Sequence, residues 1–264
     1  MSALQILSDV HLELRNKPIE VNRYAQYLAL LGDIGHPFSA SYREFVARMA
    51  QQFEHVILVA GNHEYYNSAK EQHTHQEIEA QIRYIAQSLG NVTFLQNESI
   101  MLDGVRLLGT TLWTHIPVEK FDYIQYAMSD YNRCFLTSNG GRFTPAATST
   151  WHDIATTYID TQLRQYPTLP TVVLTHHAPV SDPEVHPPRF RDDQLRCCYA
   201  TNLTHLLKKP VVAWAYGHTH WPVDKQIQGV RVLSNPEGHA EEFGSCGGSQ
   251  KNVTINLSHN VQTP

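Results

Sequence analysis

The sequence has 264 residues, of which 42% are hydrophobic and 17% are charged, and its formal net charge is -5 with histidine counted as neutral. This length and apolar content suit one large domain with a sizeable core, and they exclude a disordered or coiled-coil composition. A protein that binds nucleic-acid backbones usually carries a basic face, which the acidic balance does not support. We therefore expect no nucleic-acid partner, with a local basic patch as the open alternative.

The cysteines, at positions 134, 197, 198 and 246, are irregularly spaced and form no CxxC pair. This spacing indicates neither a zinc ribbon nor a disulfide framework, so we expect reduced thiols in a cytoplasmic protein. The chain begins directly with the apolar segment 4–7, without the basic region and long apolar run of a signal peptide. No run approaches the ~18 apolar residues of a membrane span, so we expect no membrane partner.

Short apolar runs alternate with amphipathic segments along the chain. In chain order we predict strands over 4–7 and 27–31, a helix over 42–53, a strand over 56–60, a helix over 76–89, strands over 92–95 and 105–108, a helix over 151–163, a strand over 172–175, a short helix over 202–207 and a strand over 211–216. This alternation favours a layered α/β fold with buried sheets. Strands over 223–227, 230–233 and 253–257, joined by short turns such as Gln228-Gly229, predict a second sheet of more antiparallel type.

The stretch 113–150 has no clean period and is rich in Tyr, Asn, Ser, Thr and Gly. A long irregular insertion in a compact domain is usually functional or mobile. We predict a cap-like surface excursion near the functional site, within a single domain that spans residues 1–264. A plain disordered loop is the alternative.

Five short motifs place metal-type ligands directly after apolar strands. They are Asp9-Val10-His11, Gly32-Asp33, Gly61-Asn62-His63-Glu64, His176-His177 and Gly217-His218-Thr219-His220. Each motif alone is weak, but the carboxyl ends of strands in an α/β sheet meet where ligand sites form. Carboxylate oxygen with imidazole nitrogen suits Mn, Fe or Zn better than Ca or Mg. Two adjacent cations need an anionic bridge, for which Asp33 is the natural candidate.

These motifs, in this order, resemble those of the calcineurin-like metallophosphoesterase superfamily, and they extend over residues 9–220. The resemblance is to a small single-domain, less characterised branch. It implies a four-layer α/β/β/α sandwich of two facing mixed sheets flanked by helices. It also implies a first metal held by Asp9, His11, Asp33 and His220, a second held by Asp33, Asn62, His176 and His218, and His63 as the general acid with Glu64 as its possible support.

The departures from the superfamily pattern narrow the function. Protein Ser/Thr phosphatases carry Gly-Asp-x-x-Asp-Arg-Gly, whereas this chain has Gly32-Asp33-Ile34-Gly35-His36-Pro37. The acidic partner of the catalytic histidine and the phosphate-gripping arginine are both missing, which disfavours a protein phosphatase. Purple acid phosphatases have a tyrosine ligand where His36 stands, so no coloured iron site is expected. His36 is then a ligand, a substrate contact or a turn residue, and we favour the last two.

Substrate selection must come from residues outside the metal ligands. His177 is expected behind the ligands or facing the substrate, and Asp224 either orients a ligand imidazole or is a solvated strand residue. The candidate substrate contacts are Tyr123, Tyr126, Tyr131, Asn132 and Arg133 in the excursion, and Arg189 and Arg191 after the Pro187-Pro188 pair.

The predicted protein is therefore a hydrolase that cleaves a phosphomonoester or phosphodiester by attack of a metal-bridging hydroxide. Two divalent or trivalent ions, Mn, Fe or Zn, are the expected cofactors, and a small phosphorylated molecule is the expected substrate. A nuclease of the same superfamily is one alternative, which the acidic net charge disfavours. A scaffold that binds metals without catalysis is the other, disfavoured because every ligand position is filled. The sequence carries no indication of the oligomeric state.

Overall fold

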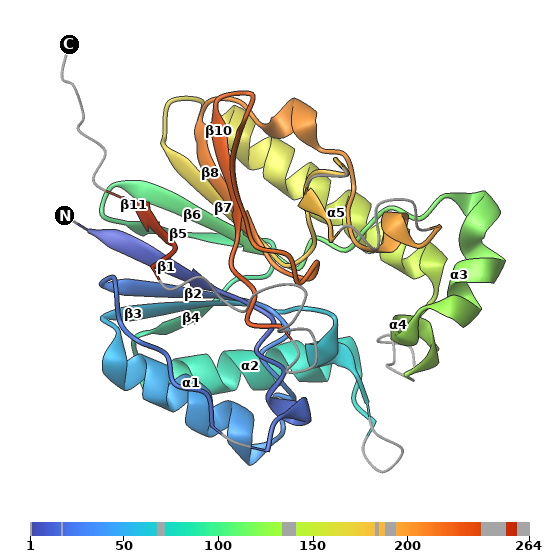
Figure 1. Ribbon diagram of the computed structural model, residues 1–264, viewed down its shortest axis with the longest axis horizontal. Coiled ribbons are helices and arrows are strands. Elements are labelled where there is room, and N and C mark those ends of the chain that lie inside the picture. The colour runs from blue at the N-terminus through green and yellow to red at the C-terminus, as the bar shows by residue number, and fades with distance from the viewer. Residues whose placement is uncertain are drawn as a thin grey trace.

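The computed structural model of the protein describes residues 2–16, 18–67, 72–133, 141–182, 185–187, 194–238 and 252–257. Two β-sheets face each other at the centre, and helices cover their outer faces (Figure 1). Three buried apolar clusters fill the spaces between helices and sheet, between sheet and sheet, and between sheet and helix. The predicted four-layer α/β/β/α sandwich of two mixed sheets is therefore confirmed.

The first sheet has five strands in the order β11-β1-β2-β3-β4. The strands from β1 to β4 are parallel, and β11 runs antiparallel to β1. Because both faces of this sheet are covered, β2 is buried along its whole length, as the continuous apolar run predicts. The strand bounds are Ala3–Leu7 (β1), Tyr27–Leu31 (β2), His55–Val59 (β3), Val92–Phe94 (β4) and Thr254–Asn256 (β11).

The second sheet has six strands in the order β5-β6-β7-β8-β10-β9. The central strands β6, β7, β8 and β10 are parallel, and the edge strands β5 and β9 are antiparallel to their neighbours. The strand bounds are Glu98–Leu102 (β5), Val105–Thr110 (β6), Thr171–Thr175 (β7), Val211–Tyr216 (β8), Val223–Ile227 (β9) and Val230–Ser234 (β10).

Two strand predictions were wrong. The last three predicted strands do not share one sheet: β9 and β10 form a hairpin at the edge of the second sheet, whereas β11 adds to the first. The reason is that β11 covers the open edge of β1 and buries Ile255 between the sheets. Strand β5 was missed because its residues are only partly buried and Met101 is exposed, so it lacks an alternating pattern.

Helices α1 (Ala40–Gln52) and α2 (His75–Leu89) cover the first sheet, and α5 (Pro145–Gln165) covers the second (Figure 1). The apolar stripes of α1 and α2 are buried, as their 3.6-residue spacing predicts. The Ser39 side chain caps α1, and a reciprocal capping box between Thr74 and Glu77 begins α2. Within the described residues, no helix is long and apolar enough to cross a membrane.

The described part of the excursion 113–150 is more ordered than predicted. It contains a 3-10 turn over Val118–Lys120 and two short helices, α3 (Phe121–Ala127) and α4 (Ser129–Asn132), before α5 begins at Pro145. Helices of seven and four residues are too short to show a 3.6-residue period, which is why the sequence pattern failed here. The predicted helix over 202–207 is likewise only a 3-10 turn, Thr204–Leu206.

Candidate metal centre

All five motifs lie at the carboxyl ends of central strands. Asp9 follows β1, Asp33 follows β2, Asn62 follows β3, His176 follows β7 and His218 follows β8. Strands β1, β2 and β3 are neighbours in one sheet, and β7 and β8 are neighbours in the other. The five loops therefore meet at one edge of the sandwich, where parallel strands end.

The backbone at this edge is strained. Left-handed conformations are uncommon for residues other than glycine and cost about 1–3 kcal/mol each, and they cluster at functional sites. Five candidate ligands adopt one, with φ angles of 54° at Asp9, 49° at His11, 53° at Asp33, 65° at His218 and 49° at His220. These tight turns direct the side chains back toward the strand ends.

Glycines allow the loops to approach closely. A β-carbon on Gly61 would overlap the Asp33 carboxylate and its backbone nitrogen, and one on Gly32 would overlap the His176 ring. A β-carbon on Gly217 would lie 2.8 Å from Oδ2 of Asp9. The glycines beside Asp33, Asn62 and His218 are thus required by space, and Gly32 is also required by its φ of 83°.

The first group of metal-type side chains comprises Asp9, His11, Asp33 and His220, whose ligand atoms all lie within 4.8 Å of one another. Nε2 of His11 is 3.0 Å from Nε2 of His220 and 3.7 Å from Oδ2 of Asp33. Nε2 of His220 is 3.5 Å from Oδ1 of Asp9. Two imidazole nitrogens and two carboxylates thus converge on one point, in the set that the resemblance implies for one ion.

The second group comprises Asp33, His176 and His218, with Asn62 beside them. Nε2 of His176 is 3.3 Å from Oδ1 of Asp33, 2.9 Å from Oδ1 of Asn62 and 3.2 Å from Nδ1 of His218. Asp33 directs Oδ2 to the first group and Oδ1 to the second. It therefore occupies the bridging position, although metal binding by these residues stays a prediction.

The charges of the centre favour bound cations. Asp9 and Asp33 are 0% and 1% exposed, and within the described residues neither forms an ion pair with lysine or arginine. Burial raises the pKa of each carboxyl, but nearby imidazoles outweigh it and hold both pKa values below their usual range. Burial likewise lowers the pKa of His176, yet Asp33 raises it to about 9. Two buried carboxylates that are surrounded by imidazoles, with no lysine or arginine paired to them among the described residues, are a fitting environment for metal ions.

Outer contacts fix the orientation of these ligands. The Asp9 carboxylate accepts hydrogen bonds from the His218 backbone amide and the Ser8 hydroxyl. Nδ1 of His176 lies 2.8 Å from the carbonyl oxygen of Leu31, so the Nδ1–H can donate and leave Nε2 for a metal. Such partners set the tautomer and direction of metal-binding imidazoles.

Asn62 is oriented by a residue that the sequence did not single out. Nδ2 of Asn62 donates to Oδ1 of Asp130 over 2.7 Å, so Oδ1 of Asn62 faces His176. The Tyr66 hydroxyl donates to the same Asp130 oxygen. Asp130 belongs to α4 and is 4% exposed, so the excursion reaches into the centre. No strand or motif precedes it, which explains why it was missed.

His63 lies at the edge of the first group, as expected of a proton donor. Its ring packs edge-on against His11, with centroids 4.5 Å apart, and against Tyr66, with centroids 4.3 Å apart. Nδ1 of His63 is 2.9 Å from Oε1 of Glu13. Burial lowers the pKa of His63, but Asp33 and Glu13 outweigh this effect and raise it. A raised pKa keeps the imidazole protonated, the form that a general acid needs.

Glu64 supports the loops rather than His63. Its fully buried carboxylate accepts hydrogen bonds from the backbone amides of Asp33, Ile34, Gly35 and Gly61. Burial and the Asp33 charge raise the pKa of Glu64 to about 7 against the lowering by these amides. Glu64 therefore joins the turns after β2 and β3 and fixes the bridging aspartate between them.

The other two predicted histidines are His177 and His36. His177 is 1% exposed and packs against the His218 ring at 4.2 Å, so it stands behind the ligands. Burial and the charge of His176 lower the pKa of His177 to about 3, so it is neutral. The backbone carbonyl of His36 accepts hydrogen bonds from the backbone amide and hydroxyl of Ser39 at the start of α1, as in a turn, and a substrate contact by its side chain stays a prediction.

The remaining candidates lie in different surroundings. Arg133 is exposed and stands 5.7 Å from the Tyr66 ring, near the centre. Tyr131 is buried and bonds the Thr148 hydroxyl, so it packs in the core and is not a substrate wall. Asp224 pairs with Arg231 on the exposed β9–β10 hairpin and is the solvated strand residue. Tyr123 and Tyr126 are exposed on α3, Asn132 donates to carbonyls of α3 and its end, and Arg189 and Arg191 lie outside the described residues.

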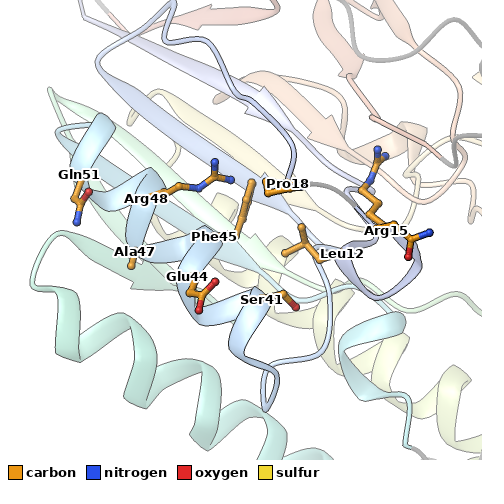
Figure 2. Close-up of a pocket in the computed structure, with 10 residues that line it drawn as sticks. Leu12, Arg15, Pro18, Ser41, Glu44, Phe45, Ala47, Arg48 and Gln51 are labelled. Carbon is orange, nitrogen blue, oxygen red and sulfur yellow. The ribbon is translucent and has the colours of Figure 1, made fainter.

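A cavity of about 260 Å³ opens beside the metal-type groups. Its lining includes the metal-type residues Asp33, Asn62, His63, His218 and His220, and also residues 127–130, His186, Pro187, Leu195 and Tyr199. A larger cavity of about 540 Å³ lies beside α1, lined by Leu12, Arg15, Phe45 and Arg48 among others (Figure 2). It shares no lining residue with the two groups, so the smaller cavity is the candidate substrate site.

This fold and these side chains define a metallophosphoesterase-type protein. The chain belongs to the calcineurin-like phosphoesterase family, whose model matches residues 5–222. It is 29% identical to an uncharacterised protein of Acanthamoeba polyphaga mimivirus, over 92% of this chain and 93% of that protein. Its fold is similar to the crystal structure of a phosphopantetheinyl hydrolase from Mycobacterium tuberculosis, with a TM-score of 0.71, 17% identity and coverage of 100% and 98%. The resemblance inferred from the motifs is confirmed.

Proposed function

We propose that this protein is a two-metal hydrolase of a small phosphomonoester or phosphodiester. The observation that carries the proposal is the position of Asp33, whose two oxygens face two separate groups of metal-type ligands. A carboxylate placed in this way holds two cations at bridging distance, which is the arrangement that serves in-line displacement at phosphorus. Manganese, iron and zinc are the ions that the oxygen and nitrogen donors favour.

The chain's own residues divide the work of hydrolysis. Bound ions would activate a water molecule as the nucleophile and neutralise charge on the phosphoryl oxygens. Asp33 fixes the two groups relative to each other, and its Oδ1 also accepts the His63 backbone amide over 2.9 Å. His63, on the cavity wall, donates a proton to the leaving oxygen, which typically contributes ~10²–10⁴ in rate.

The cavity favours a small substrate over a nucleic acid. Its described lining contains the acidic residues Asp33 and Asp130 and neither lysine nor arginine. A protein that binds a nucleic-acid backbone neutralises several phosphates with such cations. Together with the net charge of -5, this lining supports a small phosphorylated molecule as the substrate.

Hydrolysis by metal-reconstituted protein tests the proposal. Manganese-, iron- or zinc-loaded protein should hydrolyse p-nitrophenyl phosphate or bis-p-nitrophenyl phosphate, and the ratio of the two rates sorts monoester from diester preference. A panel of phosphorylated metabolites, cyclic nucleotides and a phosphopantetheinyl ester, the group named for the structural neighbour, then identifies the substrate class. Protein that binds two metal equivalents but hydrolyses no member of the panel would instead support the non-catalytic scaffold.

Two variants test whether Asp33 is a metal ligand and whether His63 is the proton donor. Asp33→Asn should abolish turnover and reduce metal content, because Asp33 belongs to both groups. His63→Asn should lower turnover by ~10²–10⁴ and leave both metals bound, since His63 acts beside the ions. Loss of metal in the His63 variant would show that His63 is a ligand and that this division of roles is wrong.

A further inference from the structure

Glu13 lies between two imidazoles of the centre, although no motif includes it. Its Oε1 is 2.9 Å from Nδ1 of His63 and 3.1 Å from Nδ1 of His11. Glu13 sits in the 3-10 turn Leu12–Leu14, which begins directly after the left-handed residue His11. This turn brings the carboxylate back over the strand end that carries the candidate ligands.

The contact to His63 decides which ring nitrogen faces the reaction. Packing against His11 and Tyr66 holds the plane of the His63 ring but does not distinguish its two nitrogens. An ionised carboxylate only accepts hydrogen bonds, so Nδ1 of His63 must carry the proton that it donates to Glu13. Within the described residues, Glu13 is the one hydrogen-bond partner of the His63 ring. In the protonated ring, the second proton is on Nε2, and it is this proton that is left for the leaving oxygen.

The same oxygen also orients a candidate ligand. Nδ1–H of His11 donates to Oε1 of Glu13, which turns Nε2 of His11 toward His220 and Asp33. One carboxylate oxygen therefore sets the direction of an imidazole in the metal group and of the imidazole beside it. The Glu13 side chain is 23% exposed, so water competes only in part for these hydrogen bonds.

We infer that Glu13 is the positioning residue of the proton donor: it fixes His63 with Nδ1 protonated and Nε2 directed to the leaving group. The inference rests on the proposed function for its effect on rate. The geometric part of the inference, namely which nitrogen of the His63 ring donates its proton to Glu13, does not rest on the proposed function. A fixed orientation of a general acid matters most for leaving groups that depart poorly without a proton.

The rate test compares two monoesters that differ in the leaving group. p-Nitrophenolate is a stable anion and departs with little help, whereas an alkoxide such as that of glycerol phosphate needs protonation. At saturating metal, Glu13→Gln should lower kcat for the alkyl ester by about 10²-fold. The loss of rate for p-nitrophenyl phosphate should be much smaller than the loss for the alkyl ester, and Glu13→Asp should restore part of the alkyl-ester loss. Glu20→Gln, an exposed carboxylate of the same segment, is the matched control.

Equal loss of rate for both esters would show that Glu13 only supports the fold, and it would overturn the inference. A third metal equivalent that is lost in Glu13→Gln would overturn it as well, because Glu13 would then be a ligand with His11 and His63.

Long-range ¹H–¹⁵N spectra of histidine in the metal-loaded protein show which ring nitrogen of His63 carries a proton, and they require no measurement of hydrolysis. At a pH high enough to leave the ring neutral, the signal that disappears in His63→Asn should show a protonated Nδ1 in the parent protein and lose this preference in Glu13→Gln. An unchanged spectrum in Glu13→Gln refutes the inference. Absence of hydrolysis by the parent protein refutes the proposed function, and the spectra still decide the role of Glu13.

Discussion

Asp130→Ala tests whether the α4 segment takes part in the metal centre. The Asp130 carboxylate is 4% exposed and accepts from Nδ2 of Asn62 over 2.7 Å and from the Tyr66 hydroxyl over 2.5 Å. Each hydrogen bond to a charged group contributes about 1.5–3 kcal/mol. Burial raises the pKa of the Asp130 carboxyl, and the cost of desolvating a buried carboxylate offsets part of this gain. We therefore expect the free energy of unfolding to fall by about 3 kcal/mol.

The effect on metal affinity is the more diagnostic one. Without Asp130 the Asn62 amide is free to turn, and loss of such an outer partner typically costs 10–100-fold in affinity. Dialysis of Asp130→Ala against graded chelator, followed by metal analysis, should show weaker binding of one equivalent. Unfolding of the metal-free variant in guanidinium gives the stability change, with Asp122→Ala, an exposed acid of α3, as the control. An unchanged affinity beside reduced stability would show that Asp130 acts in the fold alone.

Three further variants probe the loops and the cavity wall. Gly61→Ala should lose both metals, because its β-carbon overlaps the Asp33 carboxylate; retention of two equivalents on metal analysis would contradict the close approach of these loops. Glu64→Gln replaces one carboxylate oxygen that accepts hydrogen bonds from backbone amides. The free energy of unfolding in denaturant should therefore fall by about 2–4 kcal/mol relative to the parent. A free energy of unfolding equal to that of Glu20→Gln would refute this role. Burial lowers the pKa of His186 to about 4, so the unfolded state binds its proton first and stability falls as pH drops from about 6.5 to 4. Denaturation of His186→Asn across this range should show a slope shallower by up to about 1.4 kcal/mol per pH unit, and parallel curves would argue against a buried neutral ring.

The layered fold was predictable because its central strands are uniformly apolar. Strands β2, β8 and β9 have the bounds that the pattern predicts, since burial of β2 and β8 on both faces leaves a continuous apolar run. Sheet membership was not predictable at the end of the chain. β11 has only three residues, and its partner β1 stands about 250 positions earlier, so the choice of sheet depends on an edge that only the folded chain presents.

The candidate ligands were predictable for a different reason. Each candidate ligand follows a continuous apolar run that predicts a strand. The carboxyl ends of parallel strands meet at one edge of the fold, regardless of the sequence between the strands. Glu13 and Asp130 lack this signal because they reach the centre through a one-turn segment and a short helix. The segment from Gly32 to Pro37 has no acidic residue to hold His63 other than Asp33 itself. The carboxylate that contacts the His63 ring comes instead from the turn after β1, which no spacing rule within one motif indicates.

Both metal-type groups are divided between the two sheets. The first takes Asp9, His11 and Asp33 from loops of the first sheet and His220 from the second, and the second joins Asp33 to His176 and His218. Neither group is complete until the apolar cluster between the sheets has formed. The same contact brings the carboxylates of Asp9 and Asp33 together in a buried space, where the charge of Asp33 opposes the lowering of the Asp9 pKa by the neighbouring imidazoles. Cations that bind only the folded state would relieve this repulsion and stabilise the packing of the sheets by mass action, so metal affinity and sandwich stability would be linked in this fold.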